Sequence, residues 1–160
     1  MGNRKITRKY YFTVDGETEQ WYFEWLAKQI NCTPDATCLG YSNFTFELWV
    51  VLHKEDCFGA LSHRSQYLVP INRAFGENFE NLDQYKHENN FKRVLQKLCL
   101  QSVRDAVYRS RSITDRNHEH GYSLHQYKGY TYYRENPSLS LWESIEKILF
   151  DCGLMEKSCV

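Results

Sequence analysis

The sequence predicts one α/β domain that is mostly helical and has only a small sheet. Four or five segments repeat apolar residues every three or four positions, which is typical of helices. Only residues 10–14 are clearly rich in β-formers, with 38–41 and 130–133 as further candidate strands. The 160 residues are 42% hydrophobic and include 12 Tyr, 9 Phe and 4 Trp. A chain of this size can bury one core without disulfides or metals.

The N-terminal part of the chain predicts a strand followed directly by a helix. The strand at 10–14 stops at the turn Asp15-Gly16. From Glu17 the apolar residues follow helical spacing, which predicts a helix of about 14 residues. Asp15 and Thr18 are its candidate N-caps.

The middle of the chain contains one unusually apolar block. Residues 31–43 have no periodicity and carry Pro34 and Gly40. In the block 44–53 the apolar side chains surround the helix axis, which favours a helix buried on most sides over an internal strand. Residues 62–75 predict a further helix, interrupted at Pro70.

The C-terminal half predicts three more helices. Residues 88–100 are amphipathic. Ser102 and Ser140 each stand three positions before an acidic residue, a spacing that predicts a capping box and therefore a helix start. Gly153 is placed to end the last helix. Between them, residues 117–136 are polar and rich in tyrosine.

Charge and composition favour a cytoplasmic address. The 20 basic side chains balance the 20 acidic ones, so no overall basic charge points to nucleic acid. The longest apolar run, 48–52, is far below the roughly 20 residues of a membrane span. The chain starts Met-Gly, but Ile6 stands where a myristoylation signal needs Ser or Thr. The six cysteines lack metal-site spacing, so we expect reduced thiols, with Cys57, Cys99 and Cys152 in or beside the core.

The first candidate site is the acidic turn after the predicted strand. Asp15, Glu17 and Glu19 lie at the C-terminal end of a strand and in the first turn of a helix, where α/β folds bind ligands. Mg²⁺ prefers such oxygen ligands. The alternative, which spacing alone favours, is that these acids only complement the positive end of the helix dipole.

The second candidate consists of polar residues inside the apolar block. Glu47 and His53 need partners if they are buried. On one helix, Asn43 and Glu47 share a face, but His53 lies roughly 240° from Glu47, so the two cannot form one acid–base pair. We therefore expect His53 to bond a carbonyl or a carboxylate near the helix end.

Two other groups of residues suggest binding sites. Basic side chains near tyrosines could hold nucleic acid, and the alternative is a solvated helix face. This group consists of Arg104, Arg109, Arg111, Arg116 and Lys128. His118, His120 and His125 could bind zinc, although no second spaced pair accompanies them.

Three segments resemble the RloB family. They are 10–23 (YYFTVDGETEQWYF), 42–53 (SNFTFELWVVLH) and 136–138 (NPS). That family is similar to TOPRIM-domain nucleases and is found in bacterial antiviral (abortive-infection) loci, commonly beside an AAA or ABC-type ATPase. The resemblance implies a TOPRIM-derived part at 1–53 and a helical C-terminal part at 54–160.

The resemblance also implies a metal site that is incomplete in this chain. Asp15 matches the first TOPRIM carboxylate, where the family usually has Glu, and Glu19 matches the second acid. Both would be Mg²⁺ ligands, and Glu47 is the next candidate catalytic residue. The later Asp-x-Asp pair is absent from the sequence, and only residues 32–43 remain where the family has further strands and helices. The expected fold is thus a truncated TOPRIM-like core that would hold Mg²⁺ weakly.

Two functions therefore stay open from the sequence. One is a phage-defence protein of nuclease ancestry. The other is a non-catalytic helical module that binds a partner ATPase or a nucleic acid through 104–133. Because a single strand leaves unpaired backbone donors, we also expect either a homodimer or an edge covered by a loop.

Overall fold

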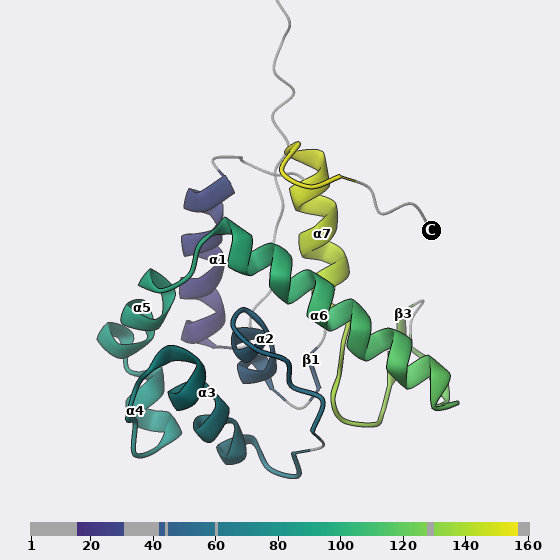
Figure 1. Cartoon of the computed structure of the whole chain (residues 1–160), viewed down its shortest axis with the longest axis horizontal. Coiled ribbons are helices and arrows are strands. Elements are labelled where there is room, and N and C mark those ends of the chain that lie inside the picture. The colour runs from purple at the N-terminus through teal and green to yellow at the C-terminus, as the bar shows by residue number, and fades with distance from the viewer. Residues whose placement is uncertain (1–15, 31–41, 44, 60, 128–129, 157–160) are drawn as a thin grey trace, which may run out of the picture.

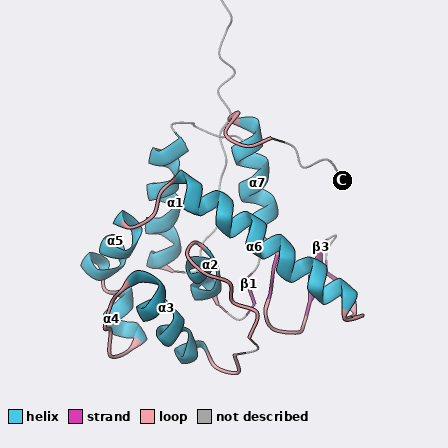
Figure 2. Cartoon of the chain, in the orientation of Figure 1, coloured by secondary structure: helices cyan, strands magenta, loops and turns pink. Residues whose placement is uncertain are grey.

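The computed structural model describes residues 16–30, 42–43, 45–59, 61–127 and 130–156. The predicted strand at 10–14 and the candidate at 38–41 lie outside these ranges. The helices are α1 (Glu17–Ile30), α2 (Phe46–Leu52), α3 (Leu68–Phe75), α4 (Leu82–Lys86), α5 (Glu88–Gln96), α6 (Leu100–Glu119) and α7 (Leu141–Asp151), with a 3₁₀ turn, η1 (Arg64–Tyr67), before α3. This described part is mostly helical, as predicted (Figure 2).

Two small antiparallel sheets accompany the helices in the described part. Strand β1 (Ser42–Asn43) pairs with β4 (Ser138–Leu139), so that Ser42 lies opposite Leu139. Strand β2 (Leu124–Tyr127) pairs with β3 (Tyr130–Tyr133) as a hairpin. The candidate strand at 130–133 is thus confirmed, and the TOPRIM-like nature of the core stays a prediction.

Helix α6 crosses the molecule and organises the core. It runs from the vicinity of α1 and α5 to the β2–β3 hairpin, and α2 lies below its first half in this view (Figure 1). It packs against α2, α7 and β4, while α1 packs against α5. Fully buried side chains from α2, α3, α5, α6 and α7 form one apolar cluster. The core therefore joins residues on both sides of position 53.

Helices α1 and α2 follow the sequence prediction closely. Helix α1 buries Tyr22, Leu26 and Ile30 along one face. Its N-cap is Gly16, whose carbonyl accepts the N–H of Gln20 at 3.3 Å, so Thr18 lies inside the helix and the prediction that it caps is wrong. All seven residues of α2 are buried, as the apolar block predicted.

Two helix starts differ from the prediction. The segment 62–75 forms η1 and then α3, and Pro70 sits in the first turn of α3, where its missing N–H leaves no hydrogen bond unmade. Helix α6 begins at Leu100 instead of after Ser102. Ser102 occupies the third helical position, where its Oγ accepts the N–H of Cys99 at 3.2 Å.

The last helix ends as predicted. Gly153 adopts φ +67°, and the N–H groups of Gly153 and Leu154 donate to Phe150 O and Leu149 O at 2.9 and 2.8 Å. This is a Schellman end, which favours glycine. Ser140 holds the N-cap position of α7 without a side-chain cap bond, so the expected capping box is not formed there. Within the described residues, no helix has the length and apolar character that a membrane span requires.

Candidate functional site

A buried ion pair joins α2 to α4. Glu47 lies in the first turn of α2 with its side chain 1% exposed, and its Oε1 is 2.9 Å from Nζ of Lys86. Thr45 caps the same turn by accepting the N–H of Glu47 at 3.4 Å. The second carboxylate oxygen of Glu47, Oε2, is buried and has no hydrogen-bond partner. Buried polar atoms are nearly always bonded, so this oxygen needs a hydrogen-bond donor or a cation.

Tyr85 connects this pair to a second carboxylate. Tyr85 precedes Lys86 in α4, is fully buried between the rings of Phe79 and Phe91, and its hydroxyl also lacks a partner. Burial raises the pKa of Tyr85 most, and the charges of Glu47 and Glu19 raise it further. The carboxylates of α1 and α2 therefore act on the same hydroxyl. We call Glu19, Glu47, Tyr85 and Lys86 the acid site.

Of the predicted catalytic carboxylates Asp15, Glu19 and Glu47, the structure describes Glu19 on α1 and Glu47 on α2, and the charges of both raise the pKa of Tyr85. Glu19 is half-buried in the first turn of α1, and its Oε2 accepts the hydroxyl of Thr18 at 2.9 Å. Asp15 lies outside the described residues. The described part of the chain contains no group of three His, Cys, Asp or Glu side chains placed to hold a metal ion.

His53 has the structural surroundings that the sequence predicted. It is 2% exposed; its Nδ1 donates to the carbonyl of Trp49 at 2.8 Å and its Nε2 accepts the hydroxyl of Tyr22 at 2.9 Å. Burial is the main cause that lowers the pKa of His53 to about 4. Its contacts differ from those of Glu47, which agrees with their predicted separation around α2.

The predicted nucleic-acid arginines contact other parts of the protein. Arg104 donates to the carbonyl of Leu154 at 2.9 Å, and Arg109 donates to the carbonyl of Leu52 at 2.7 Å. Arg111 pairs with Glu146 and stacks 5.2 Å from the ring centre of Trp142. The three side chains are half-buried on two sides of α6, and Lys128 lies outside the described residues.

The other candidates do not assemble into a site. His118 is exposed on α6, His120 bonds the carbonyl of Arg116 and His125 lies beside Tyr132, so these three histidines form no metal-binding group. Cys57 and Cys152 are half-buried at the margin of the core, as expected, and neither forms a disulfide within the described residues. Cys99 is free but exposed.

Sequence reasoning missed Tyr85 and Lys86. Helix α4 has only five residues, too short for a periodic pattern, and a lysine in a polar segment carries no sign of a buried partner. The available signal was Glu47 itself, because a carboxylate inside a buried helix demands a cation.

In comparisons with known proteins, no family model, no curated protein and no solved structure matches this chain.

Proposed function

We propose that this chain is an RloB-like phage-defence protein related to Mg²⁺-dependent TOPRIM nucleases, and that the acid site is where it acts on a phosphodiester. The observation that carries the proposal is the unpartnered, buried Oε2 of Glu47. The charge of Glu19 acts on the same Tyr85 hydroxyl as the charge of Glu47, which supports including Glu19 in the acid site. The proposal retains Asp15 as a third acid, on the resemblance alone.

The charges of the acid site fit a phosphate and a divalent cation together. Oε1 of Glu47 is already neutralised by Lys86, which is a third exposed and so can also reach an anion. Oε2 of Glu47 is left for a hard cation, and Glu19 supplies further carboxylate oxygens. A bound Mg²⁺ would supply Lewis-acid polarisation and a more acidic water.

The protein's own residues have separate roles in this proposal. Glu47 and Glu19 hold the cation. Lys86 binds a phosphate oxygen, as a point charge on a flexible stem does well. The Tyr85 hydroxyl stays protonated because its pKa is raised, so it can donate a hydrogen bond to an anion.

The test is cleavage of single-stranded and double-stranded DNA and RNA in Mg²⁺ or Mn²⁺. We expect Glu47→Gln to lower the rate at least a hundredfold, because the amide keeps the shape of the side chain and loses its charge. Asp15→Ala and Glu19→Gln should lower the rate as well. Glu55→Gln is the matched control, since Glu55 pairs with Arg73 at the surface.

Calorimetry with Mg²⁺ separates the proposal from a pure binding module. We expect a binding heat that Glu47→Gln abolishes and Glu55→Gln preserves. Cleavage that is unchanged by Glu47→Gln would reject the assignment of the site. A well-folded protein with neither cleavage nor carboxylate-dependent Mg²⁺ heat would reject the nuclease function in favour of a module that binds an ATPase or a nucleic acid.

A further inference from the structure

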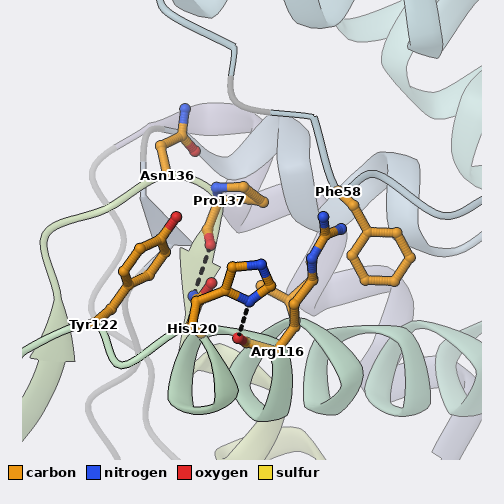
Figure 3. Close-up of a pocket in the computed structure, with 8 residues that line it drawn as sticks. Phe58, Arg116, His120, Tyr122, Asn136 and Pro137 are labelled. Carbon is orange, nitrogen blue, oxygen red and sulfur yellow. Dashed lines mark hydrogen bonds between the residues drawn. The ribbon is translucent and has the colours of Figure 1, made fainter.

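A small cavity opens beside the end of α6, apart from the residues of the acid site. It has a volume of about 200 Å³ and lies between the last turns of α6, Phe58 and the segment before β4 (Figure 3). Sites that enclose drug-sized ligands measure roughly 300–1,000 Å³, so this cavity has room for one planar group.

Asn136 and His120 are polar residues in the lining of the cavity. Asn136 donates through Nδ2 to the carbonyl of Leu61, which fixes its amide, and its Oδ1 is buried without a partner. His120 bonds the carbonyl of Arg116 through Nδ1 at 2.7 Å. Since a carbonyl only accepts, Nδ1 is the donor of this bond, and Nε2 is an acceptor in the tautomer that carries its proton on Nδ1.

Aromatic rings and one cation complete the lining. The rings of His120 and Tyr122 lie 5.8 Å apart on one side of the cavity, and the guanidinium of Arg116 lies 5.2 Å from the ring centre of Phe58 on the other (Figure 3). Flat rings accept a stacked planar ligand. Arg116 attracts an anion and repels a cationic side chain such as Lys or Arg.

Tyr67 is affected by one residue of the cavity and by one residue of the acid site. The hydroxyl of Tyr67 lies beside the amide of Asn136, which lowers its pKa, and near Glu47, which raises it. Burial remains the largest cause and raises the pKa of Tyr67.

From these features we infer that the cavity binds an amino-bearing nucleobase of a flexible, single-stranded nucleic acid, with the adjoining phosphate at Arg116. The base would stack on Tyr122 or His120 and donate its amino group to Asn136. This inference rests on the proposed function, because it supplies the substrate class of the acid site. Single strands fit because only their bases are free to leave the stack.

The first experiment is calorimetric titration of the full chain with AMP, CMP and UMP in the absence of divalent cations. We expect AMP and CMP to bind at least tenfold more tightly than UMP, which has no amino group to reach Asn136. Tyr122→Leu should weaken AMP roughly tenfold by removing a stacking ring, whereas Tyr122→Phe should bind AMP like the parent.

The second experiment isolates the contact between Arg116 and the phosphate. In the parent protein AMP should bind about tenfold more tightly than adenosine, because a charge-assisted bond is added. Arg116→Ala should remove this preference and leave adenosine affinity unchanged, while Arg116→Lys should keep most of it. Circular dichroism checks that each variant is folded.

The outcomes keep the inference separate from the proposed function. The inference would be overturned if the three nucleotides bound equally or not at all. It would also be overturned if Arg116→Ala still bound AMP more tightly than adenosine. Either result would count even if the protein cleaves nucleic acid. Glu47→Gln should bind AMP as the parent does. Nucleotide binding with this pattern but without Mg²⁺-dependent cleavage would support the cavity and reject the nuclease.

Discussion

The carboxylate of Glu47 depends on Lys86 for its charge balance. Breaking an ion pair with one buried member leaves an uncompensated charge, so we expect Lys86→Met to lower the free energy of unfolding by about 1–3 kcal/mol. Urea denaturation at neutral pH measures this. Adding Glu47→Gln to Lys86→Met should recover most of the loss, because a neutral amide needs no cation.

Lys92→Met is the matched control for this prediction. Lys92 also pairs with a glutamate, Glu88, but both side chains are about half exposed. Exposed pairs contribute little, so the control should unfold almost as the parent does. If Lys92→Met and Lys86→Met cost the same, the pairing with Lys86 does not hold Glu47 in place.

Burial of His53 makes the free energy of unfolding decrease in mild acid. Its pKa is about 4 in the folded protein and about 6.5 in an unfolded chain. The unfolded chain therefore binds the proton first, and stability is lost as the pH falls from about 6.5 toward 4. Between pH 7 and pH 5 we expect His53 to remove about 2 kcal/mol of unfolding free energy.

Urea denaturation at the two pH values tests the role of His53. His53→Gln should have a lower free energy of unfolding than the parent at pH 7. That free energy should fall less than the parent's between pH 7 and pH 5. His87→Gln, at an exposed histidine, should keep the parental slope. Glu77 does not add to the stability change between pH 7 and pH 5. Its hydrogen bond with Arg93 is the main cause that lowers its pKa to about 2. The stability that Glu77 contributes is therefore lost only as the pH falls below the ordinary carboxylate pKa of 4.5. Equal slopes for the parent and His53→Gln would contradict the prediction.

At the scale of the elements, helix α7 is followed by a backbone position with a left-handed conformation that favours glycine. Gly153 has φ +67°, and alanine there would be strained although no atom lies within 4 Å of its added Cβ. We expect Gly153→Ala to cost about 1 kcal/mol in thermal or urea unfolding. Gly59→Ala, which also meets no atom within 4 Å and has no positive φ, should change stability little; similar costs at both positions would show that φ is not the cause.

Strong periodicity explains which elements the sequence predicts. Helix α1 and the fully buried α2 were predicted because their apolar residues alone determine which faces are buried. The predicted start of α6 at Ser102 was wrong because the Ser-x-x-acid spacing does not distinguish an N-cap from the third helical position. In the structure Ser102 holds that third position and accepts the N–H of Cys99. Strands β1 and β4 are two residues long, and Ser42 pairs with Leu139 far along the sequence, so neither an alternating pattern nor a hairpin turn predicts them.

The acid site was predictable only in its carboxylates. Glu19 follows a turn and Glu47 interrupts an apolar block, so each stands out locally. Lys86 and Tyr85 reach the site because α4 packs on α5, and α5 in turn packs on α1. Contacts of this kind depend on tertiary packing, which a single sequence does not specify.

At the scale of the whole molecule, the core does not separate at position 53. Helix α1 packs on α5, and α2 packs on α3 and α6, so each helix before 53 rests on helices after it. Arg109 adds a polar link, since its donation to the carbonyl of Leu52 ties α6 to the end of α2. The described residues before position 53 therefore share one apolar core with the described residues after it.

This shared core predicts one cooperative unfolding transition. Of the 4 tryptophans, Trp21, Trp25 and Trp49 precede position 53, and only Trp142 follows it. In Trp142→Phe, tryptophan fluorescence reports only the N-terminal part, while far-UV circular dichroism is dominated by α3 to α7. We expect both signals to change at the same urea concentration, because neither part has an apolar cluster of its own to stay folded on. A fluorescence midpoint below the dichroism midpoint would mean that residues 1–53 unfold separately, and that the contacts of α1 with α5 and of α2 with α6 are weaker than their burial implies.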